Sequence, residues 1–274
     1  MSKIEEQLIS RINELQIEIT ALRPYNGNML SQIRQYYRVG LTWTSNAIEG
    51  SSYTESETKI LLEDGITVGG KTLKDTFAAL GHAQAYDYMF SLLKNKGITE
   101  KYVLTMHGMM KGGLETDEVG VYRTHAVFVT GSTFKFPSAG EIPCLMQEMF
   151  ADTIPRMANL HPVVQAAKIH ACLVAVHPFG DGNGRTARLA MNTILIQNGF
   201  LPVQIHPVIR NQYIEALRTA QSTGNSSEFV ELILQQEIES QKEILRLVGQ
   251  TQKTKYRNMA VEPKYREERS KMGF

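Results

Sequence analysis

The chain has 274 residues, 42% of them hydrophobic and 21% charged, which suits one large globular domain or one domain with small flanking elements. A formal net charge of +1 gives no overall basic field for binding nucleic acid and no acidic balance for a cationic partner. The first residues lack the apolar core of a signal peptide, and no apolar run approaches the ~18 residues that span a membrane, so we expect a cytoplasmic protein.

Apolar residues recur at helical spacing along most of the chain, which predicts a mostly α-helical fold. The first helix is predicted over about 4–22 and the second over about 29–48. Thr54 and Glu57 form a capping-box pattern that opens the third helix. Helix is expected again from about residue 141, and the remaining predicted helices span about 73–93, 100–110, 163–176, 184–198, 208–221 and 228–247.

The only β pattern in the sequence lies in residues 121–136. Val127-Phe128-Val129 precedes the turn residues Thr130-Gly131-Ser132, and Phe134 and Phe136 follow in alternation. These features predict a β-hairpin of two short strands joined by a glycine-containing loop. An isolated hairpin is marginal in water, so we expect it to pack against the helices.

One run of twelve residues concentrates glycine, acidic and basic residues between two apolar helices. It reads His177-Pro178-Phe179-Gly180-Asp181-Gly182-Asn183-Gly184-Arg185-Thr186-Ala187-Arg188. Its glycines allow successive N–H groups to face one point, and the positive end of the following helix aims at the same point. Arg185 and Arg188, three residues apart, project toward one side of that helix. These parts together predict a phosphate site, and two arginines favour more than one phosphate.

Two other side chains of this run indicate catalysis. Asp181 puts an anion beside the predicted phosphates, which makes sense if it holds Mg²⁺ that bridges phosphate oxygens. His177, at the end of the preceding helix, can take a proton from an attacking hydroxyl. Each residue alone has a structural explanation, since a lone histidine near a helix end is usually structural and arginines in a first turn oppose the helix dipole. We interpret the combination as functional.

The same run resembles the signature of Fic domain proteins, His-x-Phe-x-Asp/Glu-Gly-Asn-Gly-Arg-x-x-Arg, at every fixed position. The resemblance covers roughly residues 100–240 and extends more weakly upstream to about residue 30. It implies a Fic-type helical fold with one β-hairpin flap at 121–136. The expected organisation is an N-terminal helical region (1–95), a Fic core domain (96–248) and a polar C-terminal tail (249–274).

The resemblance implies a protein adenylyltransferase that moves AMP from ATP, with Mg²⁺, to a Tyr, Thr or Ser hydroxyl of a target protein. It implies that His177 is the general base and that Asp181 holds Mg²⁺ at the α- and β-phosphates. The other implied ATP ligands are the backbone amides around Gly182, Asn183 and Gly184 at the α-phosphate, Arg185 on the phosphate chain and Arg188 on the γ-phosphate.

A second motif, Ser45-Asn46-Ala47-Ile48-Glu49-Gly50, ends the predicted helix at about 29–49. By itself Glu49 is a glutamate near a helix C-terminus, where it opposes the helix dipole and favours a cationic partner. The stretch resembles the Fic inhibitory pattern Ser/Thr-x-x-x-Glu-Gly/Asn. That resemblance implies that Glu49 pairs with Arg188 where the γ-phosphate would bind. We expect Ser45 to hydrogen-bond Glu49 and fix its rotamer.

The flap and the base pocket are also assigned by resemblance. Gly120-Val121-Tyr122-Arg123 precedes the predicted hairpin, as a similar Gly-x-x-Arg does in the family. A target segment added to the hairpin as an edge strand would bring its hydroxyl near His177; the alternative is a hairpin that only covers the core. Many relatives have two tyrosines and an Asn where this chain has Tyr213-Ile214 and Gln221. The expected docking residues are Thr124, His125, Ala126, Val127 and Phe128, and the expected nucleotide contacts include Tyr213 and Gln221.

Three other functions stay open at this point. The same site could remove AMP from a modified protein by hydrolysis, with Glu49 orienting a water. It could transfer another nucleotide or phosphate-linked group, or hold nucleotide as a regulatory module without turnover. The expected partner is a protein substrate, with self-modification as one outcome, and neither nucleic acid nor membrane. The N-terminal helix could form a homodimer contact as well as cover the inhibitory helix.

Overall fold

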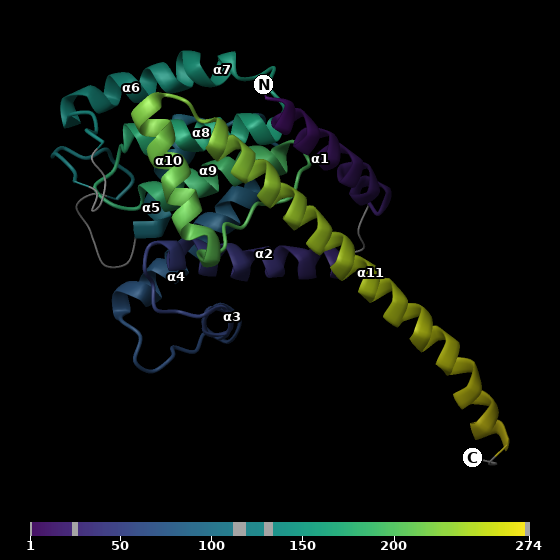
Figure 1. Ribbon diagram of the computed structural model, residues 1–274. Helices are drawn as coiled ribbons and strands as arrows, with labels where there is room; N and C mark the ends of the chain where they lie inside the picture. The colour runs from purple at the N-terminus through teal and green to yellow at the C-terminus, as the bar shows by residue number, and fades with distance from the viewer. Residues whose placement is uncertain (1, 24–26, 112–118, 129–133, 272–274) are drawn as a thin grey trace.

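The prediction of a mostly helical fold is confirmed (Figure 1). The computed structural model describes most of the chain, namely residues 2–23, 27–111, 119–128 and 134–271, with side chains through residue 249. The long helices are α1 (Lys3–Ala21), α2 (Gly27–Ile48), α3 (Glu55–Asp64), α4 (Leu73–Ser91), α5 (Glu100–Lys111), α8 (Pro162–Val176), α9 (Asn183–Gln197), α10 (Arg210–Thr223) and α11 (Ser227–Lys271).

Two helix starts follow a local sequence signal. At α3 the Thr54 hydroxyl accepts the Glu57 N–H, and the Glu57 carboxylate accepts the Thr54 N–H at 2.8 Å. Ser2 and Glu5 form the same reciprocal pair at the start of α1. Each pair satisfies backbone N–H groups that the first turn of a helix leaves without an intrahelical acceptor.

The centre of the molecule is the pair of adjacent helices α8 and α9. Every residue of α9 from Arg185 to Ile196 is buried. A helix enclosed on all sides is usually apolar all round, because a buried polar group needs a partner. α9 departs from that pattern, since it buries two arginines, two asparagines and two threonines: Arg185, Arg188, Asn183, Asn192, Thr186 and Thr193. The elements around α9 must therefore supply hydrogen-bond partners for these polar side chains.

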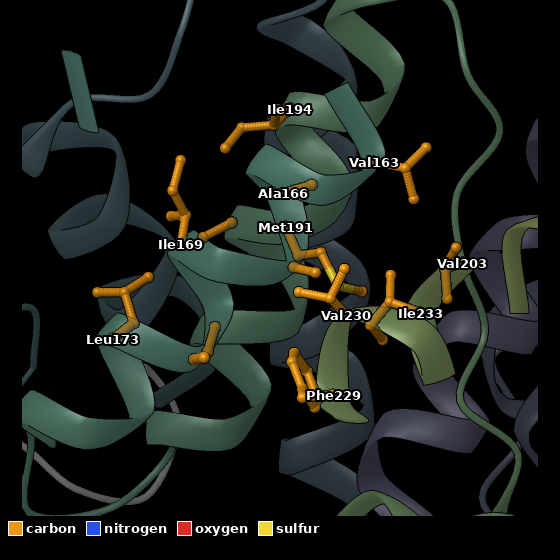
Figure 2. Close-up of a cluster of buried hydrophobic side chains, with 14 of the residues drawn as sticks. Val163, Ala166, Ile169, Leu173, Met191, Ile194, Val203, Phe229, Val230 and Ile233 are labelled. Carbon is orange, nitrogen blue, oxygen red and sulfur yellow. The ribbon is translucent and has the colours of Figure 1, made fainter. Parts of the chain in front are cut away.

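Apolar side chains of α8, α9 and α11 meet in the core (Figure 2). α1 lies along α11 and covers this core from outside (Figure 1). α2 packs against α4, and its C-terminal turn reaches α9. The side chains labelled in Figure 2 are Val163, Ala166, Ile169 and Leu173 of α8, Met191 and Ile194 of α9, Phe229, Val230 and Ile233 of α11, and Val203.

The β-hairpin expected at 121–136 is not supported. Residues 121–128 and 134–136 form no strand, and the expected turn at 129–133 lies outside the described residues. Alternating apolar residues fit an irregular loop as well as a strand when their side chains pack on a helical body. Phe134 and Phe136, for example, stack edge to face with ring centroids 5.1 Å apart.

The Arg123 side chain donates hydrogen bonds to backbone carbonyls of this loop, where pairing between two strands was expected. Its side chain is 2% exposed and donates to the carbonyls of His125 at 2.8 Å and Pro137 at 2.7 Å. It also donates to the His177 carbonyl at 2.8 Å, while the Arg123 N–H donates to the Pro178 carbonyl at 2.9 Å. The two sides of the loop are thus tied to one guanidinium and to the α8–α9 connection.

The region after this loop is helical but interrupted. α6 (Ile142–Glu148) passes through a π-helix (Met149–Thr153) into the short α7 (Ile154–Arg156). Pro155 explains the interruption, because its nitrogen carries no hydrogen and its ring would clash with the Ala151 carbonyl in a regular helix. The wider π turn accommodates both effects.

α11 is longer than the sequence pattern predicts. A helix end was expected near residue 247, but α11 continues to Lys271, and Figure 1 draws its last part leading away from the helical body. This part is rich in Lys, Arg, Glu and Gln, which have high intrinsic helix propensity. Within the described ranges, no helix is both long and apolar enough to cross a bilayer.

Asn192 of α9 provides a test of this packing. Its side chain donates to the Val203 carbonyl at 3.1 Å and accepts the Val203 N–H at 2.7 Å, out of reach of solvent. We predict that Asn192→Ala lowers the free energy of unfolding by about 2–4 kcal/mol, because both Val203 groups lose their partner. Chemical denaturation measures this difference. Asn95→Ala, at an exposed position, is the control, and a loss below about 1 kcal/mol for Asn192→Ala would contradict the prediction.

Candidate active site

The loop between α8 and α9 is held by its own residues. The Asn183 side chain accepts the Phe179 N–H at 2.9 Å and donates to the Phe179 carbonyl at 2.8 Å. Gly182, just before α9, has a φ of 83°, which a glycine adopts without a steric penalty. The Thr186 hydroxyl donates to the Gly182 carbonyl at 2.9 Å. These contacts fix the position of the first N–H groups of α9. These groups have no acceptor within the helix, so an anion bound there would accept their hydrogen bonds.

His107 of α5 fixes the same loop from outside. Its ring stacks on the buried Phe179 ring with centroids 3.8 Å apart and an interplanar angle of 5°. Its Nδ1 accepts the Gly120 N–H at 3.2 Å, so Nε2 carries the proton that is donated to the Asp181 carbonyl at 3.0 Å. Burial lowers the pKa of His107 to about 4, which keeps the ring neutral. His107 therefore orients the loop through its backbone contacts.

His177 ends α8 in an unusual backbone conformation. Its φ of 51° is the only positive value for a non-glycine residue in the described part of the chain. Such a conformation costs ~1–2 kcal/mol. The His177 N–H donates to the Leu173 carbonyl at 3.0 Å, and Arg123 donates to the His177 carbonyl at 2.8 Å. These bonds hold the backbone of His177 in place.

The His177 ring is suited to accept a proton. Its Nδ1 lies 3.3 Å from the Val174 carbonyl. A carbonyl only accepts, so Nδ1 carries the hydrogen and Nε2 keeps its lone pair. Burial lowers the pKa of the imidazole below its usual 6.5, which favours the neutral base at pH 7. The Phe136 ring packs against it with centroids 4.5 Å apart.

Asp181 is the anion of the loop. Its Oδ2 lies 3.1 Å from a terminal nitrogen of Arg185 and 2.9 Å from Nζ of Lys111, and its Oδ1 accepts the Gly182 N–H at 2.6 Å. Burial would raise the pKa of Asp181, but Arg185 and Lys111 bring it down to about 2. The carboxylate is therefore ionised at neutral pH, and its side chain is 53% exposed.

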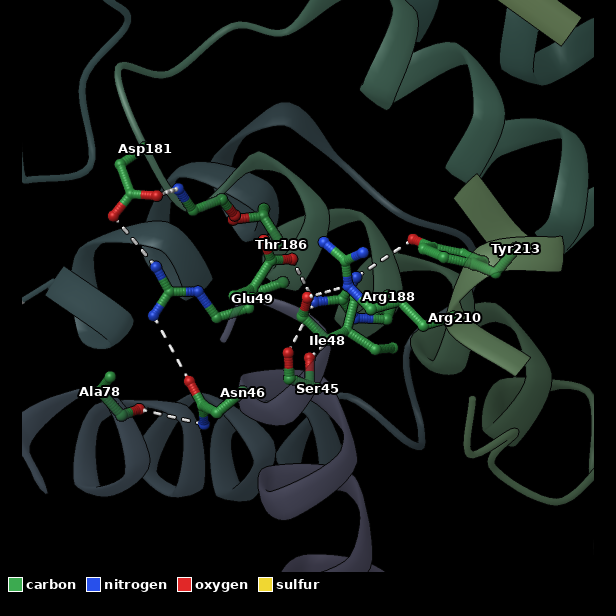
Figure 3. Close-up of polar contacts among 12 residues, drawn as sticks. Ser45, Asn46, Ile48, Glu49, Ala78, Asp181, Thr186, Arg188, Arg210 and Tyr213 are labelled. Carbon is green, nitrogen blue, oxygen red and sulfur yellow. Dashed lines mark hydrogen bonds and ion pairs between the residues drawn. The ribbon is translucent and has the colours of Figure 1, made fainter. Parts of the chain in front are cut away.

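Arg188 is the most enclosed charge of the site, with 5% of its side chain exposed (Figure 3). Its Nε donates to the Ser45 hydroxyl at 2.8 Å, and one terminal nitrogen donates both to the Ser45 carbonyl at 2.9 Å and to Oε1 of Glu49 at 2.7 Å. The other terminal nitrogen donates to the Tyr213 hydroxyl at 3.1 Å. That hydroxyl also shares a hydrogen bond with Nε2 of His170, 3.0 Å away. Four acceptors thus surround the guanidinium.

Glu49 lies directly over the first turn of α9. A Cβ atom placed on Gly184 would come within 2.6 Å of the Glu49 Oε1 and 3.1 Å of the Arg188 guanidinium. Glycine at 184 therefore leaves the space that the carboxylate fills. A carboxylate at a helix N-terminus is favoured by the helix dipole and by the free N–H groups there. Glu49 sits where those groups and Arg188 would hold an anion.

The end of α2 is secured on two sides. Arg185 donates from one terminal nitrogen to the Asn46 side chain at 3.5 Å, and Asn46 donates to the Thr42 carbonyl at 2.9 Å. On the other side, Nε of Arg210 donates to the Ile48 carbonyl at 2.7 Å, which caps the last turn of α2. These contacts set the position of Glu49, and Figure 3 labels Asn46, Ile48 and Arg210 around it.

The structure brings Glu49, Ser45, Arg188 and Tyr213 into one cluster, with details that differ from expectation. The Ser45 hydroxyl contacts Arg188 rather than Glu49. Tyr213 is 1% exposed and holds Arg188. Gln221 donates to the Val174 carbonyl at 3.4 Å, the same carbonyl that lies 3.3 Å from Nδ1 of His177.

The expected docking residues of the flap lie in the irregular loop. Thr124, His125 and Ala126 are exposed, Val127 is partly buried, and Phe128 is 96% exposed. Arg123 fastens this loop next to His177. Three residues that contact the site were not singled out from the sequence: Lys111 at Asp181, Arg210 at the end of α2, and His170 behind Tyr213. Each lies far along the chain from its partner, so no local pattern reveals it.

Comparison with known proteins identifies relatives of this chain. Residues 97–195 match the Fic/DOC family. "Protein adenylyltransferase Fic" of Drosophila mojavensis is 34% identical over 232 residues, which is 84% of this chain and 45% of the relative. The protein of the same name from Drosophila melanogaster is 32% identical over 236 residues, 85% of this chain and 47% of the relative. The chain spans about half the length of these curated relatives.

Solved structures share the fold. A Fic domain containing signaling protein from Bacteroides thetaiotaomicron superposes with a TM-score of 0.76 and 25% identity, covering 88% of this chain and 95% of that one. Fic-1 from C. elegans gives a TM-score of 0.78 and 25% identity, covering 90% of this chain and 74% of that one. The match over the α5–α9 region includes His177, Asp181 and both arginines of the loop. The chain therefore carries a domain of the Fic/DOC family over residues 97–195.

Proposed function

We propose that this chain is a protein adenylyltransferase that transfers AMP from ATP to a Tyr, Thr or Ser hydroxyl of a target protein, and that Glu49 restrains it. The observation that carries the proposal is a neutral His177 next to an anion site built from the α9 N-terminus and Arg188. The names of the Drosophila relatives support the activity.

The proposed reaction is an in-line displacement at the α-phosphorus. Nε2 of His177 takes the hydroxyl proton of the target as its oxygen bonds to phosphorus, and the bond to the pyrophosphate oxygen breaks. AMP is then esterified to the target, and pyrophosphate leaves. The N–H groups at Gly182, Asn183 and Gly184 would hold the α-phosphate as its charge grows, and Arg185 and Arg188 would neutralise the rest of the phosphate chain.

Asp181 fits the requirements of a Mg²⁺ site shared with nucleotide. No group of three or more His, Cys, Asp or Glu side chains able to hold a metal occurs in the ranges that the structure covers. Mg²⁺ is usually bound by one or two carboxylates together with phosphate oxygens, so a single ionised Asp181 beside a phosphate site suits it. When bound there, Mg²⁺ would supply positive charge to the α- and β-phosphates.

The proposed restraint follows from competition for one anion site. A γ-phosphate and the Glu49 carboxylate would use the same Arg188 guanidinium, and both are favoured by the positive end of α9. The Glu49 side chain is 42% exposed, so water can solvate it once it leaves Arg188. This supports a restraint that can be released, unlike a fully buried ion pair, whose separation is strongly unfavourable.

Removal of the Glu49 carboxylate is expected to activate the enzyme. We predict that Glu49→Gly transfers label from ATP carrying a tracer on its α-phosphate, with Mg²⁺ present, to itself or to lysate proteins. Adding His177→Ala should reduce that labelling by about 10²–10⁴, the usual contribution of a general base. Autoradiography of the separated proteins measures both effects.

Glu55→Gly is the matched control, because Glu55 is exposed at the start of α3 and lies outside the cluster. It should behave like the unmodified chain. If Glu49→Gly binds ATP but transfers no label, the proposed transfer is wrong. Release of AMP from an AMP-modified protein by the unmodified chain would then favour the hydrolytic alternative.

The reaction should depend on pH through His177. Burial lowers the pKa of this imidazole from 6.5, and the base is active only in its neutral form, which prevails above the lowered pKa. We therefore predict that the initial rate of labelling by Glu49→Gly is flat near neutral pH. It should fall as the pH drops, with a midpoint below 6.5. A midpoint above that value would argue against a buried, neutral His177 as the base.

A further inference from the structure

Lys111 occupies a specific place beside the acidic residue of the loop. It is the last residue of α5, and its side chain is only 9% exposed. Its Nζ lies 2.9 Å from Oδ2 of Asp181, although the two residues are 70 positions apart in the chain. A lysine buried to this degree at a helix end is held there by its partners, because an ammonium group is otherwise strongly hydrated.

The lone pairs of Asp181 Oδ2 are already used in this arrangement. A carboxylate oxygen offers about two acceptor sites, and this one receives a hydrogen bond from Lys111 at 2.9 Å and one from Arg185 at 3.1 Å. Oδ1 accepts the Gly182 N–H at 2.6 Å. A divalent cation bonded to Oδ2 would need one of the two donors to leave. Bonded to Oδ1, it would still lie next to the ammonium and be repelled by it.

Of the two donors on Oδ2, Lys111 has the more flexible side chain. Arg185 lies one turn beyond Asp181 on the same loop and helix, is 8% exposed, and also donates to Asn46 at 3.5 Å. Its planar guanidinium is therefore fixed from two directions. The ammonium of Lys111 is carried on a flexible four-carbon stem, and rotation of that stem moves the charge without moving α5.

We propose that Lys111 is the resident counter-ion of Asp181, that a divalent cation bound to Asp181 must displace its ammonium or bind beside it, and that Lys111 thereby sets the affinity of the nucleotide-loaded site for Mg²⁺. This inference rests on the proposed function, because it takes Asp181 as the metal ligand. Lys111 is a positioning residue in this arrangement: it acts through Asp181 and reaches no reacting atom.

Binding of Mn²⁺, followed by electron paramagnetic resonance, tests the inference without any turnover. The chain with Glu49→Gly is saturated with an ATP analogue that has a methylene bridge between its α- and β-phosphates, and Mn²⁺ is titrated in. We predict that Lys111→Met tightens Mn²⁺ binding about tenfold or more, because a positive charge next to the metal is gone. Lys111→Arg should bind Mn²⁺ within about threefold of the lysine form, since the charge is retained.

Lys101→Met is the matched control, because Lys101 is an exposed residue of the same helix α5. It should leave the Mn²⁺ affinity unchanged. Unchanged or weaker Mn²⁺ binding by Lys111→Met, with binding still lost in Asp181→Asn, overturns the role of Lys111 and leaves the proposed function standing. Mn²⁺ binding that survives Asp181→Asn overturns the metal assignment of the proposed function, and this inference with it.

Discussion

The guanidinium of Arg188 is a permanent charge in the interior, and its need for partners organises the surroundings. An isolated buried charge is very unfavourable, so acceptors must approach it from every direction. Four acceptor atoms do so: the hydroxyl and carbonyl of Ser45, the carboxylate of Glu49 and the hydroxyl of Tyr213. They come from α2, from the residue that follows it and from α10, so a single side chain of α9 joins three helices. A change in the packing of α2 would for this reason also change the site around Arg188.

The loop before α9 depends on a different principle, the satisfaction of backbone groups. Asn183 closes the loop on Phe179, and His107 bonds to the Asp181 carbonyl. Arg123 bonds to the carbonyl of His177, whose backbone conformation is otherwise unfavourable. None of these side chains has to meet a substrate. They leave the imidazole of His177 and the N–H groups of α9 facing one place, and catalytic groups that are fixed in advance need no rearrangement during the reaction.

Local signals in the sequence were sufficient for much of this. Helical spacing and the Thr54–Glu57 box act over a few residues, and the twelve-residue loop contains its own stabilising contacts. The prediction of two strands was wrong because alternating apolar residues do not show what the backbone groups bond to. These groups can bond to a neighbouring strand or, as here, to a side chain such as Arg123.

Contacts between residues far apart in the chain could not be predicted from the sequence, for a related reason. Lys111 meets Asp181 only because α5 ends beside the loop, and Arg210 caps α2 only because α10 passes it. Ser45 was expected to contact Glu49, its neighbour one turn along the same helix. Its hydroxyl instead accepts a hydrogen bond from Nε of Arg188, which lies 143 residues further along the chain.

Glu49 is part of the same polypeptide as the arginine that it meets, and this has a thermodynamic consequence. The contact opens and closes within one molecule, so the fraction closed does not change when the protein is diluted. A carboxylate on a short tether behaves as if it were present at about millimolar concentration or more, which no free acid at trace level can match. The balance is instead set by how firmly α2 is held against α4 and α9. Heat, a substitution or a bound protein that loosens α2 would therefore raise the ratio of open to closed molecules. The logarithm of that ratio changes in proportion to the free energy by which the helix is loosened.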